Sequence, residues 1–216
     1  MREKIIEAVE SEKIITIVRG VQPKDLLPLA EAMYEGGIRL MEITYDATGK
    51  VSDEETARNI ELLATQFDGR MYIGAGTVIR ENQVELTKKA GGQFIISPDT
   101  FEGVIEKTRE LDMVSIPGAL TPTEIQSAHR MGADFVKLFP IVNLGTDYVK
   151  MIKTPLSHIR LLAVGGVDES NMADLLNAGI SGFAIGGGIV NKNLIEAGKF
   201  DEITDIAKRY TEVVQK

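Results

Sequence analysis

The stretch IRLLAVGGVDESNMADLLNAGISGFAIGGGIV, residues 159–190, contains one complete strand–helix–strand unit. Its two ends, 159–167 and 181–190, are largely apolar and glycine-rich, and they lack the alternation of a strand with one face in water. Such runs are typical of parallel strands buried on both faces. The segment between them, 168–179, has a helical pattern and ends in Gly179, a common helix stop. The stretch therefore predicts two parallel strands joined by a crossover helix.

The same unit recurs along the rest of the chain. Largely apolar runs alternate with helical patterns and cover residues 14–20, 39–44, 71–78, 93–98, 113–120, 134–140, 159–167 and 181–190. The helical patterns carry boundary signals, such as Thr121 as N-cap, Pro122 at the first helical position and Glu124 in the capping-box position. Eight strands alternating with helices predict an α/β protein, a single (β/α)₈ TIM barrel. An open doubly wound sheet ranks second, because eight strands with no long break between them favour closure into a barrel.

The chain is expected to form one domain, since its 216 residues suit one barrel. Residues 1–13 predict a short amphipathic N-terminal helix rather than a signal peptide, and residues 14–216 predict the barrel. The segment 45–56 after the second strand is a long, polar and acidic connection. In a barrel it would lie at the top rim, where functional residues concentrate.

Composition narrows the class of protein. The chain has no cysteine, which excludes disulfides and thiolate metal sites. A net charge of −8 argues against nucleic acid and anionic membranes as partners, and no apolar run approaches the length of a membrane span. These features predict a cytoplasmic enzyme or binding protein.

Barrel enzymes carry their chemistry at the C-terminal ends of the strands, and Lys137 lies there within the apolar run DFVKLFP, residues 134–140. Phe135, Lys137 and Phe139 share one face of the strand. Burial lowers the pKa of an amine, and a neutral amine attacks a ketone to form a Schiff base. A lysine that reaches the rim, or that pairs structurally with a carboxylate, explains the pattern equally well.

Two other charges lie at strand ends. Glu42 in RLMEIT is a carboxylate that could transfer protons for a neutral Lys137, or could form a plain salt bridge with it. Arg19 in IVRG presents a guanidinium suited to a carboxylate or phosphate. An ordinary rim charge or a partner for Glu42 is an equally good interpretation of Arg19.

Hydroxyl and glycine positions suggest where a substrate binds. Thr77 in GAGT could offer a hydroxyl and a backbone N–H to a carboxylate. Backbone N–H groups at Gly165-Gly166 and Gly186-Gly187 follow the last two strands, where barrels often bind phosphate. We favour phosphate binding over glycines that merely permit tight turns, because both loops carry the feature.

Metal catalysis finds little support in the sequence. His129 and His158 are the only histidines, and they lack ligand-like spacing. The acidic residues 53–55 are better explained as a solvated helix start than as a magnesium site. We expect no metal and no other cofactor.

The segments IVRG, GGIRLMEIT, IGAGTV, AGGQFIISP, IPGALTPTE, VKLFP, VGGV and IGGGIV, in this order, cover almost the whole chain. Together they resemble the 2-keto-3-deoxy-6-phosphogluconate (KDPG) and 4-hydroxy-2-oxoglutarate (KHG) aldolases. The resemblance implies a (β/α)₈ barrel, commonly a homotrimer, that needs no metal.

The resemblance also implies roles. Lys137 matches the Schiff-base lysine and Glu42 the glutamate that transfers protons, usually with a water. Thr77 matches the threonine near the pyruvate carboxylate, and Arg19 an arginine that some members carry near the substrate's anionic groups. The remaining matches are Phe139 and Pro140 for the apolar wall beside the imine, and Gly165, Gly166, Gly186 and Gly187 for the phosphate loops.

Three departures from the family pattern concern anion binding. An arginine that many members carry shortly after the glutamate is absent, and Tyr45 and Asp46 stand in that region. Val164 replaces a common threonine before the first glycine pair, and Gly188 replaces a common serine after the second. Backbone amides could still bind an anion without these hydroxyls.

The sequence thus predicts a metal-free class I aldolase, a lyase that reversibly cleaves a 2-keto-3-deoxy sugar acid or 4-hydroxy-2-oxoglutarate to pyruvate and an aldehyde. The partner is a small keto acid, with or without phosphate. Two other hypotheses are a phosphate-binding barrel isomerase or synthase, with Glu42 as base and Lys137 as electrophile, and a barrel that binds a keto acid without turnover.

Overall fold

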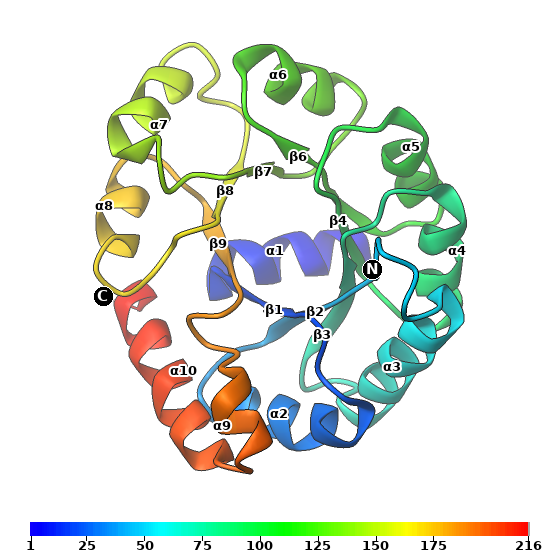
Figure 1. Ribbon diagram of the computed structural model, residues 1–216. Helices are drawn as coiled ribbons and strands as arrows, with labels where there is room; N and C mark the ends of the chain where they lie inside the picture. The colour runs from blue at the N-terminus through cyan, green and yellow to red at the C-terminus, as the bar shows by residue number, and fades with distance from the viewer. Residues whose placement is uncertain (216) are drawn as a thin grey trace.

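The strands form a parallel barrel ringed by helices, as the computed structural model of residues 1–215 shows (Figure 1). The hydrogen-bonded order is β5-β4-β3-β2-β1-β9-β8-β7-β6, and every neighbouring pair is parallel. The strands are β1 (Ile14–Val18), β2 (Leu40–Thr44), β3 (Tyr72–Gly76), β4 (Phe94–Ile96), β5 (Val114–Ile116), β6 (Gly118–Ala119), β7 (Val136–Leu138), β8 (Leu161–Val164) and β9 (Gly182–Ile185). The predicted (β/α)₈ TIM barrel is confirmed.

Helices alternate with the strands and, apart from the first, cover the outside of the barrel. They are α1 (Arg2–Glu12), α2 (Pro23–Glu35), α3 (Asp53–Gln66), α4 (Glu81–Lys89), α5 (Glu102–Glu110), α6 (Pro122–Arg130), α7 (Gly145–Lys153), α8 (Met172–Asn177), α9 (Lys192–Glu196) and α10 (Phe200–Val214). The capping box predicted for α6 is present, with Thr121 and Glu124 each accepting from the other's backbone. None of the helices in residues 1–215 is both long and apolar enough to cross a membrane.

The fifth predicted strand, residues 113–120, is divided in two, so nine strands are present where eight were expected. Pro117 separates β5 from β6 and has no N–H to donate to a ladder. Its carbonyl still accepts from the backbone N–H of Lys137. The first half pairs with β4 and the second half with β7, so this strand closes the barrel through a bend.

The lower part of the barrel interior is apolar and is closed from below by α1. Figure 1 shows α1 across the centre of the ring, behind the strands. Ile5 and Val9 of α1 are each only 1% exposed and join one apolar cluster with the inward side chains of the strands, including Phe94, Phe135 and Leu162. The open functional end of the barrel is therefore the opposite, C-terminal end of the strands.

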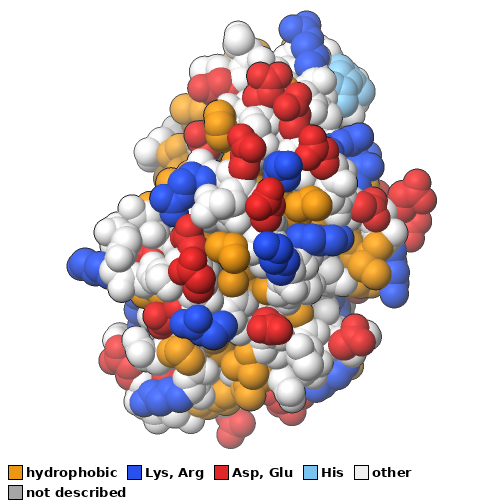
Figure 2. Space-filling view, turned by 90° about the vertical axis from the view of Figure 1, so that its right-hand side faces the viewer, with side chains coloured by type: hydrophobic (Ala, Val, Ile, Leu, Met, Phe, Trp, Pro, Cys, Tyr) orange, Lys and Arg blue, Asp and Glu red, His pale blue; other side chains and the backbone are white. Residues whose placement is uncertain are grey.

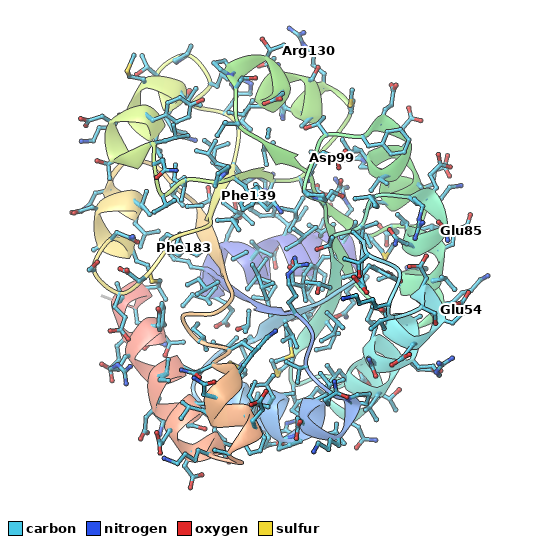
Figure 3. All side chains as sticks on the ribbon, in the orientation of Figure 1. Glu54, Glu85, Asp99, Arg130, Phe139 and Phe183 are labelled. Carbon is cyan, nitrogen blue, oxygen red and sulfur yellow. The ribbon has the colours of Figure 1, made fainter. Side chains whose placement is uncertain are left out.

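A second apolar layer joins the outward strand residues to the helices, for example Met41 with Leu29 and Ile60. The outer helix surfaces are charged. Figure 2 shows acidic and basic side chains interspersed over the face formed by α3, α4 and α5. Figure 3 places Glu54, Glu85 and Arg130 on the outside of the helical ring, whereas Phe139 and Asp99 lie within it.

The connection after β2 is shorter than the predicted segment 45–56, because α3 already begins at Asp53 behind the N-cap Ser52. Asp53 and the two glutamates after it form the first turn of α3, the helix start that the sequence favoured over a metal site. Asp46 organises the remaining loop. Its carboxylate accepts from the amides of Thr48, Lys50 and Val51, and these bonds hold its pKa at about 2.

A buried carboxylate helps to attach α1 to the barrel, which gives a stability prediction. Asp134 accepts from the guanidinium of Arg2 and from the backbone N–H of Ser115, and its side chain is only 3% exposed. Asp134→Ala would leave both donors without their acceptor, so we expect a loss of about 3 kcal/mol in the free energy of unfolding. Chemical denaturation measures this loss.

The matched control is Glu10→Ala, which removes the exposed pair between α1 and Arg160. An exposed pair contributes about 0.5 kcal/mol or less. Equal losses in the two variants would contradict a special role for the buried carboxylate.

Candidate active site

Lys137 projects from β7 into the lumen and is only 9% exposed. Phe135 lies below it, fully buried, and Phe139 lies above it at the mouth, as the shared face predicts. The Lys137 Nζ is 4.9 Å from the centroid of the Phe139 ring. The amine is thus enclosed by apolar groups at the functional end of the barrel.

Burial sets the protonation of this amine. Desolvation lowers the pKa of Lys137 below its ordinary value, and the positive charge of Arg19 lowers it further. The negative charges of Glu42 and Asp99 oppose this shift. Because desolvation is the largest effect, the fold increases the fraction of neutral amine at neutral pH.

Glu42 projects from β2 into the same space and is 3% exposed. Its Oε2 is the buried side-chain atom in residues 1–215 that finds no hydrogen-bond partner. Desolvation raises the pKa of Glu42 to about 7, against the opposing charges of Lys137 and Arg19. A carboxyl group poised near neutrality can both accept and release a proton.

Glu42 and Lys137 do not form the plain salt bridge that the sequence left open. Within the described chain, the Lys137 amine lies more than 4.0 Å from the Glu42 carboxylate oxygens, although each group influences the pKa of the other. The Oε2 of Glu42 therefore stays without a hydrogen-bond partner, although a cationic amine is near enough to influence its pKa. The geometry favours a pair used in chemistry over a pair used only for structure.

Gly76 on β3 makes room for the carboxylate. A Cβ built on Gly76 would lie 2.2 Å from Oε1 of Glu42 and 2.5 Å from its Cδ. Real Cβ atoms do not approach so closely, so any larger residue would displace the carboxylate. The glycine in GAGT therefore serves the glutamate of the neighbouring strand, a reason that the sequence pattern did not reveal.

Thr77 and Arg19 meet at the mouth. The Arg19 guanidinium donates to Oγ1 of Thr77 at 2.8 Å. Thr77 has φ of +57°, a left-handed conformation that a β-branched residue rarely adopts. Arg19 makes no ion pair with Glu42 in residues 1–215, so its plain pairing role is not supported. Two polar groups thus lie side by side at the C-terminal end of β1 and β3.

The glycine loops line an open cleft of about 720 Å³ beside the mouth. Gly165 and Gly166 have φ of +87° and +80°, which glycine adopts without strain. Phe139 and Pro140 stand against Gly165, since a Cβ there would lie 3.2 Å from the Phe139 ring and 3.4 Å from Pro140 Cβ. The predicted apolar wall therefore borders both the Lys137 amine and the glycine cleft.

Gly186 and Gly187 also line this cleft, together with Arg19 and Phe139. All ten residues predicted to form the site therefore lie at one end of the barrel.

The sequence did not single out three further cleft residues, Asn191, Lys192 and Asn193, which follow the eighth predicted strand. Nor did it single out Asp99, whose charge acts on Lys137 from the β4 side. The NKN tripeptide, just beyond a glycine-rich strand end, was the available signal.

Tyr45 and Asp46 do not face this space. Tyr45 is fully buried, and its hydroxyl contacts the Gln83 carbonyl and the Thr87 hydroxyl of α4. The Asp46 carboxylate accepts hydrogen bonds from the backbone amides of its own loop.

Among residues 1–215, no group of three His, Cys, Asp or Glu side chains is arranged to hold a metal ion.

Comparison with known proteins agrees with this geometry. A family model described as KDPG and KHG aldolase matches residues 5–206. The 2-dehydro-3-deoxy-6-phosphogalactonate aldolase of Escherichia coli K12 is 30% identical over 203 residues, which are 94% of this chain and 96% of the relative. The 2-dehydro-3-deoxy-phosphogluconate aldolase of Treponema pallidum is 32% identical over 214 residues, which are 97% of each chain.

A solved structure provides a chemical comparison. The KDPG aldolase of Legionella pneumophila, with pyruvate captured at low pH as a covalent carbinolamine intermediate, is 27% identical to this chain. It superposes with a TM-score of 0.84 over 94% of this chain and 96% of the other.

Proposed function

Because this chain belongs to the KDPG and KHG aldolase family, we propose that it is a Schiff-base aldolase of the lyase class. It reversibly cleaves a 2-keto-3-deoxy sugar acid, or 4-hydroxy-2-oxoglutarate, to pyruvate and an aldehyde. One observation carries the proposal, namely the desolvated amine of Lys137 facing the unpartnered carboxyl group of Glu42. An isomerase or a non-catalytic barrel does not need a nucleophilic amine at this point.

In the cleavage direction, the neutral Lys137 amine attacks the C2 ketone and forms a carbinolamine. Loss of water gives a protonated imine, which withdraws electrons from the neighbouring carbons. The C3–C4 bond then breaks, its electron pair moves toward the imine nitrogen, and an enamine is left on the lysine. The lowering of the Lys137 pKa supports the first step, because only the neutral amine is a nucleophile.

Glu42 transfers protons during bond cleavage and product formation. As a carboxylate it accepts the proton of the C4 hydroxyl while the C3–C4 bond breaks, so that the aldehyde leaves neutral. The same carboxyl group then returns a proton to C3 of the enamine, and water hydrolyses the resulting imine to free pyruvate and lysine. A pKa of about 7 suits a group that must take and give a proton in one cycle.

The other predicted residues bind and orient the substrate. Arg19 and Thr77 are hydrogen-bonded to each other and would bind the pyruvate carboxylate. Phe139 and Pro140 form the apolar wall that excludes water from the imine. Gly165, Gly166, Gly186 and Gly187 would hold a phosphate or second carboxylate at the far end of the substrate.

Three broader expectations belong to the proposal. The whole chain acts as one aldolase domain, which the match over residues 5–206 supports. It assembles as a homotrimer, as the family resemblance implies. It works in the cytoplasm. Sedimentation velocity tests the assembly, and cell fractionation tests the location.

A panel of keto acids tests the function. The purified protein is incubated with 2-keto-3-deoxy sugar acids of both gluconate and galactonate configuration, phosphorylated and not, and with 4-hydroxy-2-oxoglutarate. Pyruvate release is followed with lactate dehydrogenase. We expect turnover of at least one member, with kcat in the range of about 1–10³ s⁻¹. Binding without pyruvate release across the panel would instead support a non-catalytic barrel.

A further inference from the structure

The cleft beside the barrel mouth is positively charged, although the whole chain is acidic. Its lining includes two cationic side chains, Arg19 and Lys192, and within the described residues it includes no aspartate or glutamate. The chain as a whole has a net charge of −8. A cleft that opposes the net charge of its own protein favours an anionic occupant.

Both hydroxyl positions expected from the family resemblance are apolar here. Val164 is buried in the apolar lumen cluster, where it offers no donor. At Gly188, a Cβ would lie 2.5 Å from the Tyr210 hydroxyl oxygen, so a serine there would have to displace that hydroxyl. The chain must therefore hold an anion in this cleft through other donors.

Lys192 is placed to supply such a donor. It begins α9, and its side chain reaches back toward β1, where a Cβ on Gly20 would lie 3.5 Å from the Lys192 Nζ. Gly20 directly follows Arg19 in the chain, so both cations stand on the same side of the mouth. Within residues 1–215 no carboxylate lies within 4.0 Å of Lys192, whereas the nearby Lys199 is paired with Glu202.

We propose that Lys192 determines the preference of this chain for a phosphorylated substrate, and this inference rests on the aldolase function proposed above. Its ammonium group supplies the hydrogen bonds to the phosphate that the missing threonine and serine hydroxyls do not. The backbone amides of the two glycine loops complete the site. In this chain, the phosphate end of the substrate is recognised by the positive charge of Lys192 rather than by hydroxyl groups.

The test compares kcat/KM for a 2-keto-3-deoxy-6-phospho sugar acid and for the same acid without phosphate. In the wild type we expect the phosphorylated acid to be preferred. In Lys192→Met the preference, expressed as the ratio of the two kcat/KM values, falls about tenfold or more, because one charge-assisted hydrogen bond is lost. Lys192→Arg retains most of the preference.

Lys50→Met is the matched control. Lys50 lines a separate cleft of about 410 Å³ on the other side of Arg19, so its loss changes the net charge without touching the glycine loops. Inorganic phosphate provides an independent probe as a competitive inhibitor of cleavage of the unphosphorylated acid. Its inhibition constant should rise about tenfold or more in Lys192→Met and stay within about twofold in Lys50→Met.

Two results would overturn the inference, namely an unchanged preference in Lys192→Met, or equal losses in Lys192→Met and Lys50→Met. A wild type that does not prefer the phosphorylated acid would also overturn it. Covalent capture of the wild type by pyruvate and borohydride tests the aldolase proposal separately from the role of Lys192. If the wild type is captured covalently but its preference does not depend on Lys192, only the present inference fails.

Discussion

Lys137→Met abolishes pyruvate release, with kcat/KM reduced by about 10⁴-fold or more on the best substrate of the wild type. Methionine fills a similar volume in the lumen but has no nitrogen that could attack the C2 ketone. Without an imine, the electrons of the C3–C4 bond have no acceptor, so binding alone cannot support cleavage. Pyruvate formation coupled to lactate dehydrogenase measures the loss.

Lys137→Arg separates nucleophilicity from charge. The guanidinium keeps a positive charge near Glu42 but stays protonated, so the variant should be as inactive as Lys137→Met. Circular dichroism and the Tm show whether each variant is folded. A folded Lys137→Met protein that keeps more than about a tenth of the wild-type activity would contradict the imine mechanism.

Glu42→Gln is expected to lower kcat by about 10²–10⁴-fold, the range typical of a lost general acid–base group. The amide has nearly the same shape, so the space opened by Gly76 remains filled. Lys137 keeps its desolvated surroundings and should still be captured by pyruvate and borohydride. Turnover and capture are measured on the same preparation. Loss of both to the same degree would show that Glu42 acts on imine formation alone.

The same variant should be more stable than the wild type at alkaline pH. Burial raises the pKa of Glu42 to about 7 in the folded state, whereas an exposed glutamate has its ordinary value of 4.5. Between these values the folded state binds more protons than the unfolded state, so stability falls as pH rises through the window. Glu42→Gln removes this penalty, and we expect its Tm to exceed that of the wild type by about 5 °C at pH 8.

The advantage should shrink toward pH 5, where the folded wild type keeps Glu42 protonated. Differential scanning calorimetry at both pH values measures it. A Tm difference that is constant with pH would contradict the raised pKa of Glu42.

Much of the site follows from the sequence because barrel geometry links strand ends to one surface. A lysine inside DFVKLFP and a glutamate inside RLMEIT are anomalies in buried strands, and the barrel brings the C-terminal ends of all strands to one mouth. The period of two also predicts correctly that Phe135, Lys137 and Phe139 share the lumen face. The same reasoning predicts that the glycine pairs after the last two strands lie at this mouth.

Other features depend on contacts between distant segments, which one strand's pattern does not encode. Pro117 divides a strand into two halves, which pair with different neighbours. Tyr45 turns outward to α4, although it follows directly after the site strand. Lys192 enters the cleft only because α9 begins beside β1, and an exposed lysine on a short helix is otherwise unremarkable in sequence.

The most direct test of the central claim is mass spectrometry of the protein after incubation with pyruvate and sodium borohydride. A nucleophilic amine at residue 137 predicts one reduced pyruvyl group per chain, located on the peptide that contains Lys137. It predicts no such group in Lys137→Met. An unmodified wild-type chain, or modification of a different lysine, would contradict the assignment of Lys137 as the Schiff-base residue.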